Sequence, residues 1–395
     1  MNYNFNELIT RRGTNCVKWD AAADADVLPM WVADMDFRTA PAITDALRKR
    51  VEQGIFGYTH VPNEYYEAVI NWFSRRHGWT IRKDWILYIP GVVPALSAII
   101  KALCQPGDQV LIQTPVYNCF FSSIRNNGCK ALSNPLVREG DTYRMDFDDL
   151  ERKASDPKTR LMLLCNPHNP AGRVWTRDEL LRVADICFRH NVTVVADEIH
   201  CELVFPEYTY TPFASLSDEC QARAITCVSP SKAFNTAGLQ IANIVCSDAE
   251  VHARIDRAIN INEVCDVNPF GVLATIAAYN EGEDWLEQLI AYLEENYRAF
   301  QAFCAEQLPQ FPLTKLEGTY LIWMDCTALH TSSERLEQAL VEKAKLRLNA
   351  GTMYGAEGEG FMRWNIACPR SRMLEGLRRF ADFVKENKRD AHFFC

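Results

Sequence analysis

The sequence lacks an uninterrupted hydrophobic segment long enough to cross a lipid bilayer. Its most apolar long window, residues 86–104, is broken by Pro90, Gly91 and Pro94 and contains Lys101. A membrane-spanning helix needs about 20 consecutive apolar residues. The opening stretch, MNYNFNELITRRG, also has no apolar core of signal-peptide length. We therefore expect a cytoplasmic protein that has no membrane partner.

An excess of basic residues is also missing. Lysine and arginine together number 42, aspartate and glutamate 51, and the formal net charge is −9. Binding to nucleic acid or to an anionic membrane surface depends on a basic surface that neutralises phosphates. The charge balance therefore argues against both of these partners.

Cysteine pairs with metal-binding or redox spacing are absent as well. The 15 cysteines are scattered singly between Cys16 and Cys395, and no two stand at Cys-x-x-Cys spacing. The sequence therefore predicts neither a zinc site nor any other metal cofactor. Many of these cysteines lie inside apolar runs, as Cys165 and Cys246 do. A dispersed, odd-numbered set is typical of a reducing compartment rather than of a disulfide scaffold.

The sequence does contain apolar runs of strand length that alternate with helical patterns. With 395 residues, of which 48% are hydrophobic, it is long enough for two folded domains. The runs at 161–164 and 192–196 predict strands buried on both faces, as in a parallel sheet covered by helices. Between them, residues 176–190 form an amphipathic pattern in which Thr176 and Glu179 have the spacing of a capping box. The alternation predicts an α/β fold, with further strands at 86–89, 110–112, 224–228 and 241–245 and further helices at 94–103 and 118–125.

The pattern changes after about residue 268. Residues 285–308 predict one long helix that links the first domain to a second, smaller α+β unit. That unit contains predicted strands at 320–323 and 361–366 and predicted helices at 334–345 and 371–388. We expect an N-terminal segment, residues 1–50, that packs on the small domain, a large domain, residues 51–284, and a small C-terminal domain, residues 285–395.

Three short polar motifs follow predicted strands. They are CNPHNPAG at 165–172, ADEIH at 196–200 and SPSKAFN at 229–235. Ligands of open α/β sheets bind beyond the carboxyl ends of the strands, so an amide, a carboxylate and an amine would reach one edge of the sheet. Each motif alone has a plainer interpretation, as a turn, a helix cap or a solvated lysine. These interpretations weaken together because all three motifs occur in this order in one chain.

The combination resembles the fold-type-I enzymes that use pyridoxal 5'-phosphate (PLP), the aspartate-aminotransferase superfamily. NPHNPAG resembles its Asn-Pro-x-Asn-Pro-x-Gly motif, DEIH its pyridine-binding aspartate motif and SPSKAFN its cofactor-binding lysine motif. Within the superfamily, five stretches resemble the MalY/PatB branch of cystathionine β-lyases, also called cysteine-S-conjugate β-lyases: LPMWVADMDFRTAP (28–41), GIFGYTH (54–60), TPVYNCF (114–120), DEIHCELVF (197–205) and RWNIACPRS (363–371).

This resemblance covers essentially the whole chain and implies a fold. The large, PLP-binding domain would hold a mixed, mostly parallel seven-stranded sheet between helices. The C-terminal domain would be smaller and of α+β type.

The resemblance also implies roles at the cofactor ring. Lys232 would bind the cofactor covalently and, once the substrate amine displaces it, take the substrate Cα proton. Asp197 would pair with the pyridine nitrogen, and this positive charge would hold the pKa of Asp197 low. Asn169 would donate a hydrogen bond to the phenolic oxygen, and Tyr117 would stack on the ring. His200 would tune the ring oxygen, although a purely structural histidine is an equally open interpretation.

The implied phosphate site depends on neutral donors. The backbone N–H groups of Val92 and Val93 would lie at a helix N-terminus, where anions are favoured, and Ser229 and Ser231 would add hydroxyls. Many aminotransferases have an arginine at the position of Gln240, so this site would carry less positive charge.

Tyr58 resembles the tyrosine that reaches the phosphate, and the substrate, from the partner subunit. If Tyr58 has this role, the protein is a homodimer with shared active sites.

The substrate site would be built around Arg363, whose planar guanidinium suits an α-carboxylate. Trp31, Tyr320 and Trp323 are candidate walls for a thioether side chain, and core packing is the plainer interpretation of all three aromatics.

The resemblance favours a small amino-acid substrate and α,β-elimination. L-cystathionine or a related cysteine S-conjugate would yield pyruvate, ammonia and a thiol. The thiol from cystathionine would be homocysteine, a step of methionine biosynthesis. The alternatives are a PLP-dependent aminotransferase and a catalytically quiet regulatory protein on the same fold.

Overall fold

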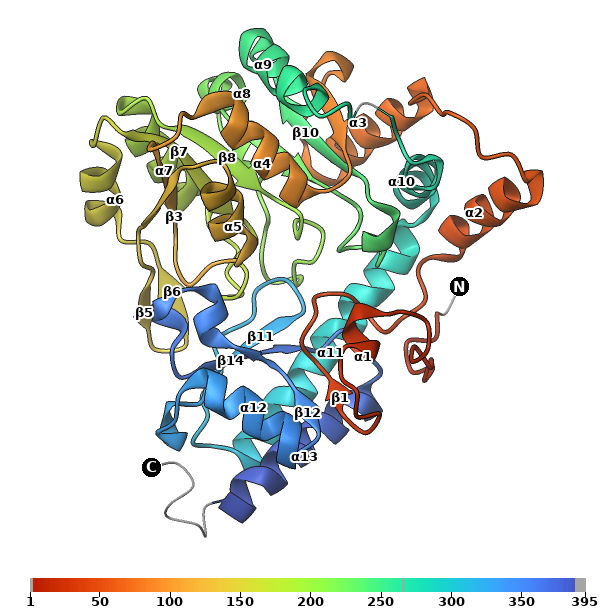
Figure 1. Ribbon diagram of the computed structural model, residues 1–395, viewed down its shortest axis with the longest axis vertical. Coiled ribbons are helices and arrows are strands. Elements are labelled where there is room, and N and C mark those ends of the chain that lie inside the picture. The colour runs from red at the N-terminus through yellow and green to blue at the C-terminus, as the bar shows by residue number, and fades with distance from the viewer. Residues whose placement is uncertain (1–2, 265, 388–395) are drawn as a thin grey trace.

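The computed structural model describes residues 3–264 and 266–387. A seven-stranded sheet lies at the centre of the larger lobe (Figure 1). The strand order is β2-β10-β9-β8-β7-β3-β4; β10 runs antiparallel to both of its neighbours, and the other pairs are parallel. The sheet is mixed and mostly parallel, as predicted. Its strands are β2 (Ile86–Ile89), β3 (Gln109–Ile112), β4 (Lys130–Ser133), β7 (Thr159–Cys165), β8 (Thr193–Asp197), β9 (Ile225–Val228) and β10 (Ala242–Cys246).

Helices cover both faces of this sheet, which explains why its central strands are apolar throughout. Successive side chains of a strand point to opposite faces. In β7, Leu161 and Leu163 pack in one apolar core, and Met162 and Leu164 pack in another. The first core is closed by α4 (Val92–Leu103), α5 (Cys119–Asn126) and α9 (Ala249–Asn260). The opposite face is covered by α3 (Asn63–His77), α6 (Phe147–Ala154), α7 (Arg177–Arg189), α8 (Asp218–Arg223) and α10 (Pro269–Glu281).

The smaller lobe is built on a three-stranded antiparallel sheet of order β11-β14-β13 (Figure 1). The 25-residue helix α11 (Glu283–Gln307) runs from the larger lobe into the smaller one. The other elements of this lobe are α12 (Ser333–Lys343), α13 (Arg370–Asn387), β11 (Leu321–Asp325), β12 (Leu346–Arg347), β13 (Asn349–Ala350) and β14 (Phe361–Asn365). A separate hairpin is formed by β5 (Val137–Glu139) and β6 (Thr142–Arg144).

The N-terminal segment contacts both lobes. After the short helix α1 (Val17–Asp20), strand β1 (Leu28–Pro29) pairs in parallel with β12 of the smaller lobe. Helix α2 (Pro41–Gln53) lies instead against α10. The proposed domain limits at residues 50 and 284 stay a prediction.

Local sequence signals place the elements well. Each helix and strand expected from the sequence is present, with ends shifted by a few residues at most; the expected end of the last helix at Lys388 lies outside the described residues. The capping box of α7 is confirmed, because Thr176 Oγ1 accepts the Glu179 N–H and a Glu179 carboxylate oxygen accepts the Thr176 N–H at 2.8 Å.

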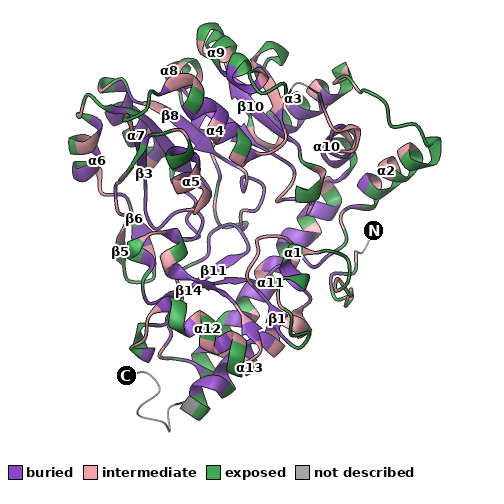
Figure 2. Ribbon diagram, viewed as in Figure 1, coloured by how far each residue is buried: buried purple, intermediate pink, exposed green. Residues whose placement is uncertain are grey.

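The interior of both lobes is apolar, and the strands of both sheets are largely buried (Figure 2). The cysteines of the described residues are all free thiols, and most of them are buried; Cys265 and Cys395 lie outside that part. Among the helices of the described residues, none is both long enough and apolar enough to cross a membrane.

Candidate active site

The three polar motifs meet at one edge of the large sheet. Strands β7, β8 and β9 are parallel neighbours, and Cys165 at the end of β7 stands in register with Asp197 at the end of β8. Asp197 in turn stands in register with Cys227 of β9, directly before the loop that carries Lys232. Chain direction therefore brings the amide, carboxylate and amine of the motifs to the same side.

Lys232 is anchored to the N-terminal segment. Its Nζ donates a hydrogen bond to the backbone carbonyl of Ala33 at 2.6 Å, and the Tyr320 hydroxyl donates to the same oxygen at 2.9 Å. Burial lowers the pKa of Lys232 to about 8, assisted by the positive charge of Arg363, while the Asp197 carboxylate opposes the shift. An amine with this pKa is partly neutral near neutral pH and is able to act as a base.

Asp197 is buried and has few partners. One of its oxygens accepts the backbone N–H of Ile199 at 3.2 Å. Burial raises the pKa of Asp197 to about 7, and the Ile199 bond and the charge of Lys232 only partly oppose this. The expected low pKa depends on the positive charge of a bound ligand ring and stays a prediction, because in the polypeptide alone desolvation outweighs the compensating groups of Asp197. A cationic ligand group in contact with this carboxyl would restore its charge.

Arg363 on β14 crosses from the smaller lobe to meet Asn169. Its Nη1 donates to Asn169 Oδ1 at 3.1 Å, and its Nη2 donates to the carbonyl of Trp31 at 2.7 Å. The side chain is buried, yet its Nε has no hydrogen-bond partner among the described residues. Buried guanidinium N–H groups are normally satisfied, so the free Nε marks a place for an acceptor such as a carboxylate.

Tyr117 and His200 both remain neutral in this environment. Burial raises the pKa of the Tyr117 phenol, and the Asp197 carboxylate adds to the shift. Burial lowers the pKa of His200 well below its usual value, and the charges of Lys232 and Arg363 act in the same direction. The His200 ring lies edge-on to Tyr320, at 6.0 Å between centroids, and its Nδ1 has no hydrogen-bond partner in the described part of the chain.

A helix N-terminus faces the same edge. Strand β2 is antiparallel to β10, and β10 is antiparallel to β9, so β2 runs in the direction of β9 and ends at the same edge of the sheet, with β10 between them. Helix α4 begins there at Val92, and no side chain of the described residues caps it. The N–H groups of Val92 and Val93, in its first turn, are therefore open to an anion.

Of the two neighbouring serines, Ser231 is the freer donor. Ser229 donates its hydroxyl hydrogen to the carbonyl of Ile241 at 2.7 Å, and its oxygen lies 2.9 Å from that of Ser231. Ser229 therefore stabilises its own loop, and its hydroxyl hydrogen is already used in the bond to Ile241.

The expected aromatic residues take different places. Trp323 stacks on Phe361 in the core at 5.0 Å, so the core interpretation holds for it. The Trp31 ring packs against the Arg347 guanidinium at 3.9 Å, and Trp31 reaches Arg363 through its backbone carbonyl. Tyr58 is 96% exposed, on the loop after α2, and lies outside the cluster formed by its own chain.

Three groups that contact the site residues were not predicted from the sequence. They are the Ala33 carbonyl, the Asn235 side chain and the ring of Tyr354, which lies 4.9 Å from the Arg363 guanidinium carbon. Ala33 lies in the stretch MWVADMDF, which stands out as a motif. Its contribution was missed because it is made by the backbone carbonyl, and the residue type does not indicate which carbonyl accepts a hydrogen bond.

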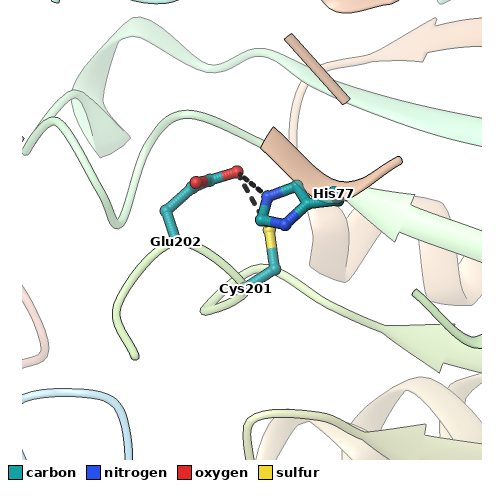
Figure 3. Close-up of side chains that lie close together, drawn as sticks. All are labelled: His77, Cys201 and Glu202. Atoms are coloured by element: carbon teal, nitrogen blue, oxygen red, sulfur yellow. Dashed lines mark hydrogen bonds and ion pairs between the residues drawn. The ribbon is translucent and has the colours of Figure 1, made fainter. Parts of the chain in front are cut away.

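A second polar cluster joins Cys201 and Glu202, on the loop that follows β8, to His77 at the end of α3 (Figure 3). One Glu202 oxygen accepts from Trp72 Nε1 at 2.6 Å and is 2.8 Å from His77 Nε2, and the other accepts from Arg76 Nε at 3.0 Å. Burial acts to raise the pKa of Glu202, but His77 and Arg76 outweigh it and lower this pKa to about 2. The cluster is thus a buried ion-pair network that ties the loop after β8 to α3.

Comparison with known proteins agrees with this geometry. Residues 25–380 match the model of the family described as aminotransferase class I and II. The chain is 45% identical over 380 residues to cystathionine beta-lyase PatB of Bacillus subtilis, covering 95% of this chain and 98% of that protein. It is 35% identical over 389 residues to protein MalY of Escherichia coli, covering 97% and 99%. The structure matches that of cystalysin from Treponema denticola, which contains a pyridoxal 5'-phosphate cofactor, with a TM-score of 0.95 and 33% identity over 98% and 100% of the two chains.

Proposed function

The chain belongs to the aminotransferase class I and II family and to its MalY/PatB branch, and on this premise we propose that it is a PLP-dependent carbon–sulfur β-lyase. Its substrates are L-cystathionine or related cysteine S-conjugates, which it cleaves to pyruvate, ammonia and a thiol. The observation that carries the proposal is the near full-length similarity, at 45% and 35% identity, to PatB and MalY, of which PatB is named a cystathionine beta-lyase.

The residues of the site fit PLP. Asp197, with its pKa raised by burial, suits a ligand that brings a positive charge to a ring nitrogen. The uncapped first turn of α4 and the Ser231 hydroxyl suit a phosphate. Lys232 supplies an amine with a lowered pKa between these two places.

When bound, PLP supplies an aldehyde that joins to an amine and a ring that accepts electrons from the substrate Cα. Asp197 holds the proton on the ring nitrogen and so preserves the charge that draws in these electrons. Lys232 would hold the cofactor, and its amine, when free, would act as the base that takes the proton from the substrate Cα. The Asn169 amide would donate to the ring's phenolic oxygen, and Tyr117 would pack on the ring face.

The remaining residues bind and orient. Arg363 clamps the substrate α-carboxylate and, through Asn169, links the substrate site to the cofactor site. The N–H groups of Val92 and Val93, with Ser231 and more weakly Ser229, hold the phosphate. His200, as a neutral imidazole beside Tyr320, limits the charge near the ring.

Incubation with L-cystathionine tests the reaction. We expect the purified, PLP-loaded protein to release pyruvate and a free thiol in equal amounts, because expulsion of the thiolate from Cβ leaves a fragment that decays to pyruvate and ammonia. Pyruvate is measured with a coupled dehydrogenase and the thiol with a chromogenic disulfide. Amino transfer that depends on an added 2-oxo acid, without pyruvate release, would favour the aminotransferase alternative. A protein that binds PLP but turns over neither reaction would favour the regulatory alternative.

We also propose a homodimer in which Tyr58 of the partner subunit completes each site. The end of α2 and the loop after it lie at the rim of the molecule (Figure 1) and expose large apolar side chains: Val51 (55%), Ile55 (68%), Phe56 (56%) and Tyr58 (96%). A contiguous exposed apolar stretch of this kind marks a protein interface. The free thiols of the described residues support a reducing, cytosolic compartment.

Subunit mixing tests the shared site. Tyr58→Ala alone is expected to weaken PLP affinity about tenfold or more, through loss of a hydrogen bond to a charged group, and Lys232→Ala alone to be inactive. Each mixed dimer contains one site with both residues intact, so random reassortment should restore about a quarter of wild-type activity. Differently tagged subunits are co-expressed, and pyruvate release is measured at limiting PLP. Activity no higher than the average of the two parent variants would contradict a shared site.

A further inference from the structure

The loop that carries Lys232 is held against the N-terminal segment by several hydrogen bonds, and the side chain of Asn235 makes three of them. This residue stands three positions after Lys232 and has a left-handed backbone, with φ +55°, which asparagine tolerates better than most residues. Its amide makes three hydrogen bonds to backbone groups: Oδ1 accepts the Met35 N–H at 3.0 Å, and Nδ2 donates to the Met35 carbonyl at 3.0 Å and to the Phe37 carbonyl at 2.9 Å.

The segment held by Asn235 carries the oxygen to which Lys232 is bonded. Ala33, two residues before Met35, accepts from Lys232 Nζ at 2.6 Å and from the Tyr320 hydroxyl at 2.9 Å. On the other side of Ala33, Asn365 Nδ2 donates to the carbonyls of Val32 and Asp34 at 2.5 and 2.6 Å. Two asparagines thus fix the backbone around the Ala33 carbonyl. Asn365 does so from β14, and Asn235 does so from the loop that carries Lys232.

We propose that Asn235 is a positioning residue for Lys232, which it serves by holding the Ala33 carbonyl as the acceptor for the lysine amine when that amine is free. This inference rests on the proposed function, in which Lys232 removes the substrate Cα proton after its displacement. A neutral amine has two N–H bonds and one lone pair. One N–H held by the Ala33 carbonyl restricts rotation about the Cε–Nζ bond and so limits the directions that the lone pair can take.

The same hydrogen bond acts on the charge of Lys232. A carbonyl oxygen that accepts from an ammonium group stabilises the charged form and raises its pKa. Burial and Arg363 lower the pKa of Lys232 to about 8, and the Asp34 and Asp197 carboxylates oppose this shift. A looser Ala33 carbonyl would therefore let the pKa of Lys232 fall further.

Asn235→Gly tests the proposal, because glycine accepts the left-handed backbone and removes the amide without adding charge. In the PLP-loaded enzyme we expect kcat for pyruvate release to fall about tenfold and KM to change less than about threefold, since Asn235 does not touch substrate. In the full-length chain freed of cofactor, we expect the pKa of Lys232 to fall by roughly half a unit. That pKa is measured by competitive acetylation across a pH series and mass spectrometry of the Lys232 peptide.

Thr39→Val is the matched control. Thr39 Oγ1 donates to the Phe234 carbonyl at 2.6 Å and so joins the same two stretches of chain, but its bond lies beyond Phe37 and does not hold Ala33. We expect kcat and the pKa of Lys232 to stay close to the wild-type values in this variant. Equal losses of kcat in both variants, with the pKa of Lys232 unmoved, would reduce Asn235 to a general structural tie and overturn the proposal.

A second variant of Asn235 and the independence of the acetylation measurement from lyase activity complete the test. If the glycine variant does not fold, Asn235→Asp is the second test. It keeps the size of the side chain and the acceptor for the Met35 N–H, but it replaces the Nδ2 donor with a carboxylate oxygen that repels the carbonyls of Met35 and Phe37. Its kcat should fall at least as far, and an unchanged kcat would refute the proposal. The acetylation measurement needs no lyase activity, so it can succeed or fail independently of the reaction assigned to the enzyme.

Discussion

Replacing Lys232 by alanine is expected to lower kcat for pyruvate release by about 10⁴-fold or more. The variant has neither the amine that binds the cofactor nor the base that removes the substrate Cα proton, and general base catalysis alone contributes about 10²- to 10⁴-fold. The fold should persist, because the substitution removes one hydrogen bond to the Ala33 carbonyl, and the Tyr320 hydroxyl still donates to that oxygen.

The signature of this substitution is specific. The visible absorbance of the lysine-linked cofactor should disappear in Lys232→Ala, and a small primary amine added to the solution should restore part of the activity, because it replaces the missing base. Lys158→Ala, which removes an exposed lysine on a surface turn, serves as the control and should behave as wild type. A Lys232→Ala enzyme with near-normal turnover would remove the centre of the proposed mechanism.

Asp197→Asn is expected to lower kcat by about 10²- to 10³-fold. A neutral amide does not keep the ring nitrogen protonated, so the electron-accepting character of the cofactor falls, and losses of this size are typical when a preorganised electrostatic partner is removed. Steady-state pyruvate release at saturating PLP measures the effect. Turnover within about threefold of wild type would contradict the role assigned to Asp197.

The same substitution should stabilise the cofactor-free chain, with a pH dependence that identifies the cause. Burial raises the pKa of Asp197 from 3.8 to about 7, so its charged form destabilises the folded state above both values. The cost grows as pH rises from about 4 to about 7 and is constant above that. Asp197→Asn removes the cost, so its advantage in free energy of unfolding should be near zero at pH 4 and on the order of a few kcal/mol above pH 7.

Urea unfolding of both cofactor-free proteins across this pH range measures the difference. Asp382→Asn, on the exposed face of α13, is the matched control and should show no such trend. A gain for Asp197→Asn that does not depend on pH would mean that burial of the charge is not its source.

The secondary structure and the family were readable from the sequence because both depend on local signals. Residues 161–164 predict a strand buried on both faces, and the structure places their alternate side chains in two different cores. The Thr176 and Glu179 capping box involves residues three positions apart, so spacing alone identifies it. The three strand-end motifs are equally local, and strand direction then brings them to one edge.

Tertiary structure decided the contacts and the charges of the site. Arg363 meets Asn169 across 194 positions of sequence, and Trp31 contributes a backbone carbonyl where its ring was expected. The raised pKa of Asp197 follows from burial, and the tie between Asn235 and Met35 follows from the path of a segment 200 residues away. Local patterns in the sequence determine which segments become helices and strands. Burial and the approach of distant backbone atoms exist only once those elements have packed, so the state of Lys232 and its neighbours had to come from the folded chain.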